Sequence, residues 1–303
     1  MKTGRRNRNA FTLIEMLVVI TIIGILAALV LTGIYAVLPA VYISMISTET
    51  STLSQAVERY KIETGDYPPD FTDRKTVERH LRKIFPRNAA LNNPQENAAW
   101  ADAVAKIDPA EALPFWLASV STDPILPLTS QLDPNFPFYL QGNRKVWFDF
   151  DQSRLTDVDG DGYPEYYPKN SNQAPFVYFD SRTYAHPRAS YPQAEFTDDA
   201  GTTYAATNFT EPVEFEGIAR PYHERIPVDA GGGNLNYFFV DSKKYQIIGA
   251  SLDGHYGSRV EDVQNSLLDN VRVYPAGINY TRNDADNITS FSDGQVLENG
   301  IPE

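Results

Sequence analysis

The chain has 303 residues, and 42% of them are hydrophobic, which is average for a globular protein. The average conceals two unlike parts, because every position from Met16 to Ile46 is uncharged, whereas the remaining chain is rich in Asp, Tyr, Pro and Asn. The formal net charge is -13, and such an acidic surface repels phosphate backbones, so we expect no nucleic-acid partner. The chain has no cysteine, which excludes disulfides, thiolate metal sites and a cysteine nucleophile.

The amino terminus combines a basic segment with a long apolar run. No acidic residue accompanies the four basic ones ahead of the run, which are Lys2, Arg5, Arg6 and Arg8. A helix over residues 16–46 would be about 46 Å long, whereas the hydrocarbon core of a bilayer is about 30 Å thick. A Sec-type signal peptide would have a shorter apolar core and an Ala-x-Ala cleavage site after it. We therefore predict a single membrane span at residues 16–46, with the basic end in the cytoplasm.

Glu15 is an acidic residue at the head of this apolar segment. A charge at membrane depth costs at least about 2.5 to 3.5 kcal/mol on insertion scales unless it finds a partner, so Glu15 is a candidate functional residue. If the chain is cut between Ala10 and Phe11, the new α-amine of Phe11 becomes a cation four residues before Glu15. Within one helix, or between two packed helices, this ammonium and the carboxylate could neutralise each other.

The residues around this position, Asn9-Ala10 followed by Phe11-Thr12-Leu13-Ile14-Glu15, resemble the class III signal of type IV pilins and type II secretion pseudopilins. The resemblance implies that a prepilin peptidase cuts between Ala10 and Phe11 and methylates the new amine. It also implies that Glu15 docks on a neighbour's terminus during filament assembly. Ala10 stands where the family usually has Gly, and it keeps the small size required there.

The apolar run is followed by an amphipathic continuation of the same helix. Leu53, Val57 and Tyr60 recur at spacings of three and four residues, which is typical of a helix with one apolar face. Gly65 and the following Pro68-Pro69 end the helix. The prediction is a leader at residues 1–10, a long helix at 11–65 and a globular head at 66–303. The end of the helix also resembles that of the major pseudopilins.

The head is predicted to be an α+β domain. Residues 72–85 and 96–107 have helical character, and Asp108 has the form of an N-cap that opens a short helix through Trp116 and Leu117. Short aromatic and β-branched runs at 145–150, 176–179, 237–240 and 245–248 predict strands. The resemblance implies a type IV pilin-like fold, in which an antiparallel sheet packs on the second half of the long helix. Residues 70–235 would then be a large mixed insertion.

One segment of the head has the pattern of a calcium loop. Carboxylates stand at its first, third, fifth and ninth positions, with Gly160 at the sixth. Ca²⁺ takes six to eight oxygen ligands, and alternate acidic side chains in a tight loop converge on one point. We predict calcium binding here as an alternative to a plain Asp/Gly-rich surface turn. The predicted ligands are Asp157, Asp159, Asp161, the backbone carbonyl of Tyr163, and Glu165.

A second metal site is predicted nearer the carboxyl terminus. The segment from Tyr245 to Gly257 and the later residues 283–288 resemble the last strand and the calcium-binding closing loop of major pseudopilins. Asp253, Asp284 and Asp286 match the acidic positions, although residues 258–282 separate the two halves by more than the family pattern does. A plain hairpin turn at Asp253-Gly254 is an equal alternative.

Catalytic patterns are weak, so we expect a structural protein and not an enzyme. The four histidines stand in no two-histidine metal spacing, and no Gly-x-Ser-x-Gly occurs. The resemblance implies a filament subunit of a type II secretion pseudopilus or type IV pilus, processed by prepilin peptidase and stabilised by calcium. Its expected partners are other pilin or pseudopilin subunits, prepilin peptidase, the secretion assembly platform and the cytoplasmic membrane. The head would lie in the periplasm or in an extracytoplasmic filament.

Two alternatives stay open. One is a membrane-anchored periplasmic head that binds or hydrolyses a ligand and never polymerises. The other is a pilus for surface adhesion or DNA uptake, and the acidic head disfavours the role in DNA uptake.

Overall fold

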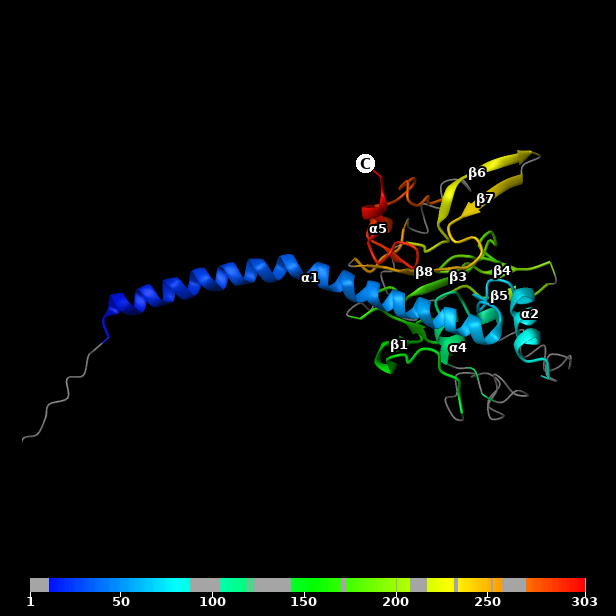
Figure 1. Cartoon of the computed structure of the whole chain (residues 1–303), viewed down its shortest axis with the longest axis horizontal. Coiled ribbons are helices and arrows are strands. Elements are labelled where there is room, and N and C mark those ends of the chain that lie inside the picture. The colour runs from blue at the N-terminus through cyan, green and yellow to red at the C-terminus, as the bar shows by residue number, and fades with distance from the viewer. Residues whose placement is uncertain are drawn as a thin grey trace, which may run out of the picture. The chain divides into compact units, whose positions relative to one another are not determined.

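The structure is a computed structural model, and Figure 1 shows its helices and strands along the chain. It describes residues 11–87, 104–118, 120, 122, 143–169, 173–199, 201–207, 217–231, 234–251, 253–257 and 271–302. The predicted leader at residues 1–10, including Ala10, lies outside the described residues, as does the first part of the predicted helix at 96–107.

The described chain begins with one long helix, α1 (Leu13–Thr64). Its end follows from Gly65, which has a φ of +81° and donates its N–H to the carbonyl of Lys61 at 2.7 Å. A left-handed residue after the last turn is a common way to stop a helix, and glycine adopts this conformation without the steric cost of a Cβ atom. The helix end predicted at Gly65 is confirmed.

The chain divides into two compact units, Met1–Val41 and Tyr42–Glu303, and α1 contributes to both. In the first unit, Leu13–Leu31 is the one stretch of the described chain that is long and apolar enough to cross a membrane, and none of it is buried. The predicted span at residues 16–46 extends further than this stretch. Ile46, at the end of that span, is only 2% exposed and belongs to the core of the second unit.

The second unit has its core against the remaining turns of α1. Leu53, Val57 and Tyr60, which form the predicted apolar stripe, are fully buried. They pack with side chains from α2 (Arg74–Ile84) and α4 (Ala112–Ala118), among them Trp116. Both helices confirm sequence predictions. The side chain of Asp73 caps α2 by accepting hydrogen bonds from the backbone of its first turn.

A three-stranded antiparallel sheet lies beside α1, in the order β3 (Val177–Asp180), β8 (Tyr245–Gly249), β9 (Ile288–Thr289). Successive side chains of the sheet alternate between two hydrophobic clusters, as the period of a strand requires. Tyr178 and Ile247 join the cluster that contains the stripe of α1, whereas Val177 and Ile248 join a second cluster on the other face. The sheet is therefore covered on both faces.

The remaining strands form three two-stranded antiparallel pairs. These pairs are β1 (Leu155–Thr156) with β2 (Glu165–Tyr166), β4 (Phe196–Thr197) with β5 (Thr203–Tyr204), and β6 (His223–Gly231) with β7 (Asn234–Phe239). Other short helices of the described chain include η2 (Gln152–Arg154), α5 (Arg282–Ala285) and η4 (Leu297–Gly300). A long amino-terminal helix followed by antiparallel sheets confirms the predicted α+β class.

The strand predicted at residues 145–150 is wrong. Trp147 donates its N–H to the carbonyl of Leu117 at 2.8 Å, and its own carbonyl accepts from Arg59 Nη2 at 2.7 Å. The backbone groups that a strand would offer to a neighbouring strand are thus taken by the end of α4 and by a side chain of α1. The buried aromatic side chains of Trp147 and Phe150 produced the strand-like pattern.

Candidate functional site

The start of α1 is closed by a reciprocal capping arrangement between Thr12 and Glu15. The N–H and the hydroxyl of Thr12 both donate to Glu15 Oε2, at 2.8 and 2.6 Å. The N–H of Glu15 points back to Thr12 Oγ1 at 3.3 Å. A Thr-x-x-Glu sequence is typical of such a capping box, which satisfies donors that have no partner within the helix. The carboxylate that interrupts the apolar segment is therefore also part of the local helix start.

Phe11 and Glu15 lie on one side of this helix start. Together with Ile14, Val18 and Val19 they line a shallow depression of about 320 Å³. Phe11 is 69% exposed. The structure thus places the predicted processing residue Phe11 and the predicted assembly residue Glu15 in one neighbourhood.

In the head, the predicted calcium loop is held between the paired strands β1 and β2. Asp157 organises its backbone: Oδ1 accepts from the N–H of Gly160 at 2.7 Å, and Oδ2 accepts from the N–H of Gly162 at 3.0 Å. Both glycines have positive φ values, +76° and +100°, so the loop turns sharply twice. Both carboxylate oxygens of Asp157 face the backbone of its own loop.

Two further carboxylates of the loop, Asp159 and Asp161, converge with Glu111, which precedes α4. One oxygen from each residue lies within 4.8 Å of the other two. Glu111 is fixed because its Oε2 accepts from the N–H of Asp108 at 2.8 Å. Ala110 N–H in turn donates to Asp108 Oδ1 at 2.7 Å, so Asp108 and Glu111 cap this segment from both sides.

Three carboxylate oxygens in and beside this cluster are buried and have no hydrogen-bond partner in the described part of the chain. They are Oε1 of Glu111, Oδ2 of Asp161 and Oε1 of Glu165. The other oxygen of Glu165 accepts from the N–H of Val158 at 3.1 Å. Buried polar atoms are nearly always paired, and a carboxylate oxygen can be paired with a proton or with a cation.

Burial makes this cluster electrostatically unfavourable when it is ionised. Desolvation, reinforced by the neighbouring carboxylates, raises the pKa of Asp159 to about 7 and the pKa of Asp161 to about 8. The same causes raise the pKa values of Glu111 and Glu165 well above the usual range. A bound cation reverses this effect, because it favours the charged form of every carboxylate around it.

The structure brings together some of the five predicted ligands and adds one that sequence reasoning missed. Asp159 and Asp161 converge, Glu165 is near enough to interact electrostatically with Asp159, and Asp157 accepts hydrogen bonds from the loop backbone. The side chain of Tyr163 is buried, with its ring 6.2 Å from that of Phe115. The missed residue is Glu111, and its signal in the sequence was the Asp-x-x-Glu capping pattern at residues 108–111.

The second predicted metal site has a different geometry. In the described chain, the carboxylates of Asp253, Asp284 and Asp286 do not converge within the distance seen in the first cluster. Asp284 is buried and pairs with Arg272, with Nε and Oδ1 2.5 Å apart. Asp284 Oδ2 also accepts from the N–H of Thr281 at the start of α5. The second metal site stays a prediction.

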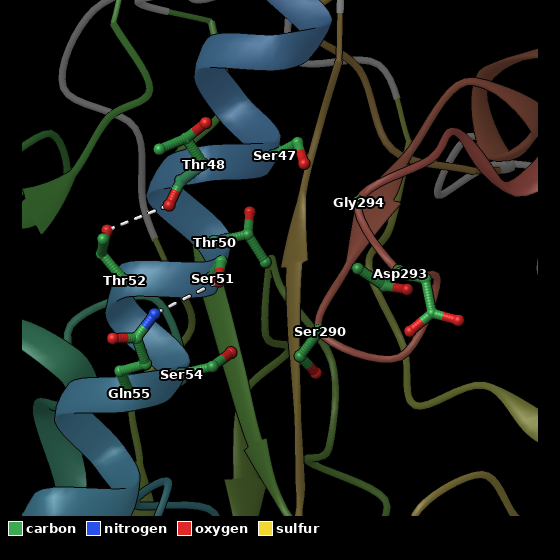
Figure 2. Close-up of a pocket in the computed structure, with 11 residues that line it drawn as sticks. Ser47, Thr48, Thr50, Ser51, Thr52, Ser54, Gln55, Ser290, Asp293 and Gly294 are labelled. Atoms are coloured by element: carbon green, nitrogen blue, oxygen red, sulfur yellow. Dashed lines mark hydrogen bonds between the residues drawn. The ribbon is translucent and has the colours of Figure 1, made fainter.

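A hydroxyl-lined groove of about 540 Å³ lies between α1 and the turn after β9 (Figure 2). Thr52 Oγ1 donates to the carbonyl of Thr48 at 3.1 Å, and Gln55 Nε2 donates to Ser51 Oγ at 3.4 Å, so part of its polar wall is bonded within the helix. The groove offers hydroxyl groups, the amide of Gln55 and the carboxylate of Asp293. It is lined by Ser47, Thr48, Thr50, Ser51, Thr52, Ser54, Gln55, Thr289, Ser290, Asp293 and Gly294.

Comparison with known proteins identifies the amino-terminal segment. Residues 5–31 match the family model for the prokaryotic N-terminal methylation motif. No curated protein and no solved structure shows significant similarity to the chain. The match covers the predicted cleavage position, Glu15 and the apolar stretch of α1, and it confirms the predicted prepilin-type signal. The chain thus carries the methylation signal and apolar helix of a type IV pilin-like or pseudopilin-like precursor, the class that prepilin peptidase processes.

Proposed function

We propose that this protein is a structural subunit of a filament, either a type II secretion pseudopilus or a related type IV pilus-like assembly. The observation that carries the proposal is the methylation motif at residues 5–31, joined to a helix whose apolar stretch contains a single acidic residue at its start. The proposed partners are other pilin or pseudopilin subunits, prepilin peptidase and the secretion assembly platform. The basic leader would face the cytoplasm, and the head would lie in the periplasm or the filament.

The arrangement at Thr12 and Glu15 suggests how assembly would use the carboxylate. In the separate chain Glu15 is bonded to Thr12, so it is not left without a donor at the helix start. A cut before Phe11 creates an ammonium group in the same neighbourhood. Since a charge pair in an apolar setting is stronger than in water, the Phe11 ammonium of one subunit and Glu15 of its neighbour would hold the two helices in register.

The secretion role is favoured over DNA uptake by charge. The head carries the excess of acidic residues that gives the chain its net charge of -13, which opposes contact with DNA. In the same proposal calcium stabilises the head, because metal bound only by the folded state shifts the folding equilibrium. A membrane-anchored head that binds or hydrolyses a ligand without polymerising is the competing function.

Mass spectrometry of protein extracted from the membrane tests the processing step. We expect a chain that starts at Phe11 and carries a methylated amine. Recovery of an intact Met1 start from cells with an active prepilin peptidase would contradict the proposal.

Substitution of Glu15 tests the assembly step. Glu15→Ala should leave membrane insertion and cleavage intact and abolish filament formation, measured by cross-linking and electron microscopy. Glu63→Ala is the matched control, because it removes an exposed carboxylate from the same helix and should assemble normally. Normal filaments from the Glu15 variant would contradict the docking role of Glu15, whereas a wild-type protein that is processed but forms no filament would favour the non-polymerising alternative.

A further inference from the structure

The head contains two acidic elements, far apart in sequence, that meet at one buried point. One is the loop between β1 and β2, and the other is the capped segment that leads into α4. We propose that a calcium ion binds between them, with Glu111, Asp159 and Asp161 as ligands and Glu165 completing the acidic wall. This deepens the calcium part of the proposed function by assigning its ligands, and it rests on the geometry of the head rather than on filament assembly.

The position of Glu111 is the strongest argument. The capping bond from Asp108 N–H to Oε2 fixes the side chain, and Glu111 is only 1% exposed. Its second oxygen, Oε1, is buried and has no hydrogen-bond partner in the described residues, and Glu111 converges with the two loop carboxylates. A carboxylate that is held in place by a capping hydrogen bond through one oxygen, and whose other oxygen accepts no hydrogen bond from the described residues, is preorganised to bind a cation.

The separations of the oxygens fit a calcium ion. Calcium binds oxygen at about 2.3 to 2.6 Å, so two ligands on opposite sides of the ion are about 5 Å apart. The three converging oxygens, which lie within 4.8 Å of one another, can therefore share one coordination shell. Glu165 lies outside this group of three, and its carboxylate acts electrostatically on Glu111 and so adds negative charge near the site. Oxygen-only ligands of this kind suit a hard cation such as calcium and do not suit the soft metal ions that prefer thiolate ligands.

Asp157 has a positioning role in this arrangement. Because its two oxygens accept from Gly160 and Gly162, it sets the turns that direct Asp159 and Asp161 inward. The ligand set thus differs from a set drawn from the loop alone. It contains Glu111 in place of Asp157, and Glu111 is 46 residues earlier in the chain.

The ion would join two parts of the head. On one side is the start of α4, whose Asp108 also accepts from Thr207 Oγ1 at 2.8 Å. On the other side is the hairpin β1–β2, whose Tyr166 hydroxyl donates to Glu49 of α1 at 2.7 Å. A calcium ion here ties α4 to a hairpin that is anchored on α1, in a chain that has no disulfide to make such a link.

The test is terbium luminescence and thermal unfolding of the full-length chain in detergent, after removal of metal with EDTA. Terbium replaces calcium and is excited through nearby aromatic rings, such as that of Tyr163. We expect the wild type to bind terbium, to release it to calcium, and to melt at a higher temperature in calcium than in EDTA. Glu111→Gln should weaken binding about tenfold or more and remove most of the calcium-dependent rise.

The change in melting temperature that a substitution causes in EDTA distinguishes a metal ligand from a residue that only supports the fold. Without metal, Glu111→Gln should melt at the wild-type temperature or above it, because the cap acceptor is kept and one of the repelling carboxylates is gone. Asp161→Asn should behave in the same way. Asp149→Asn, which removes an exposed carboxylate outside the cluster, is the matched control and should bind as the wild type does.

Three outcomes would overturn the assignment: no terbium signal from the wild type, unchanged affinity in Glu111→Gln, or an equal loss of melting temperature in calcium and in EDTA. None of these measurements depends on polymerisation. A protein that binds calcium but forms no filament would contradict the filament function alone, and the reverse result would contradict this site alone.

Discussion

His80 is a buried residue whose protonation makes the stability of the folded head depend on pH. Its Nε2 lies 2.7 Å from the hydroxyl of Tyr60, and its ring packs edge-on against Trp116. Burial, assisted by the positive charges of Arg182 and Lys83, lowers the pKa of His80 to about 3, and Asp66 opposes this shift only partly. The imidazole is therefore neutral in the folded protein over the whole physiological range.

We expect His80 to make folding less favourable as the solution is acidified. The unfolded chain binds a proton near pH 6.5, whereas the folded chain resists it down to about pH 3, so stability is full above pH 6.5 and falls below it. Between pH 7 and pH 5 the loss from this residue is about 2 kcal/mol. Denaturant unfolding in EDTA at both pH values should show that His80→Gln loses less stability than the wild type by about this amount. Parallel losses in the two proteins would assign the acid sensitivity to other groups.

At the scale of elements, the hairpin β1–β2 is fastened to α1 through a compact polar contact. Arg154 Nη1 donates to Glu49 Oε2 at 2.9 Å, a second guanidinium nitrogen contacts the other oxygen, and Tyr166 donates to the same carboxylate. The side chains of Arg154 and Glu49 are 18% and 13% exposed. A two-point contact between partly buried charges is stronger than an ordinary surface ion pair.

A double-mutant cycle measures this contact. We expect Glu49→Gln and Arg154→Met to destabilise the head individually, and their coupling energy to be about 1 to 2 kcal/mol in urea unfolding. The pair Glu63 and Lys145 is the matched control, because it also joins α1 to a neighbouring segment but its side chains are 43% and 48% exposed. Its coupling should be below about 1 kcal/mol. Equal coupling in the two cycles would mean that burial does not strengthen the Glu49 contact.

Local patterns predicted the elements whose signals lie within a few residues of one another. The stripe of Leu53, Val57 and Tyr60 indicated the buried face of α1, and the spacing of Asp159 and Asp161 indicated a tight acidic loop. Glu111 could not be assigned to that loop, since 48 residues separate it from Asp159 and only the folded chain brings the two together. The segment around Trp147 was misassigned for the related reason that its hydrogen-bond partners, the end of α4 and Arg59, are also distant in sequence.

At the scale of the whole molecule, the division at Val41 and Tyr42 separates two kinds of surface. The apolar side chains of Leu13–Leu31 are exposed. An exposed apolar surface of this extent is typical of a segment that contacts lipid or other helices. From Ile46 onward, the apolar face of α1 is instead buried in the core of the second unit. One helix therefore presents an exposed apolar surface in the first unit and supplies part of the hydrophobic core of the second unit.

This division predicts where the chain can be shortened. A fragment of residues 42–303 retains every α1 side chain found in the core, so we expect it to be soluble without detergent and to unfold in one cooperative transition. A fragment of residues 53–303 also loses Ile46 and Glu49, and it should be less stable by about 3 kcal/mol or more, since burial of one large aliphatic side chain is worth about 2 to 5 kcal/mol. Calorimetry of the two fragments checks both statements. Aggregation of the longer fragment, or equal stability of the two, would show that the head does not begin where the packing of α1 indicates.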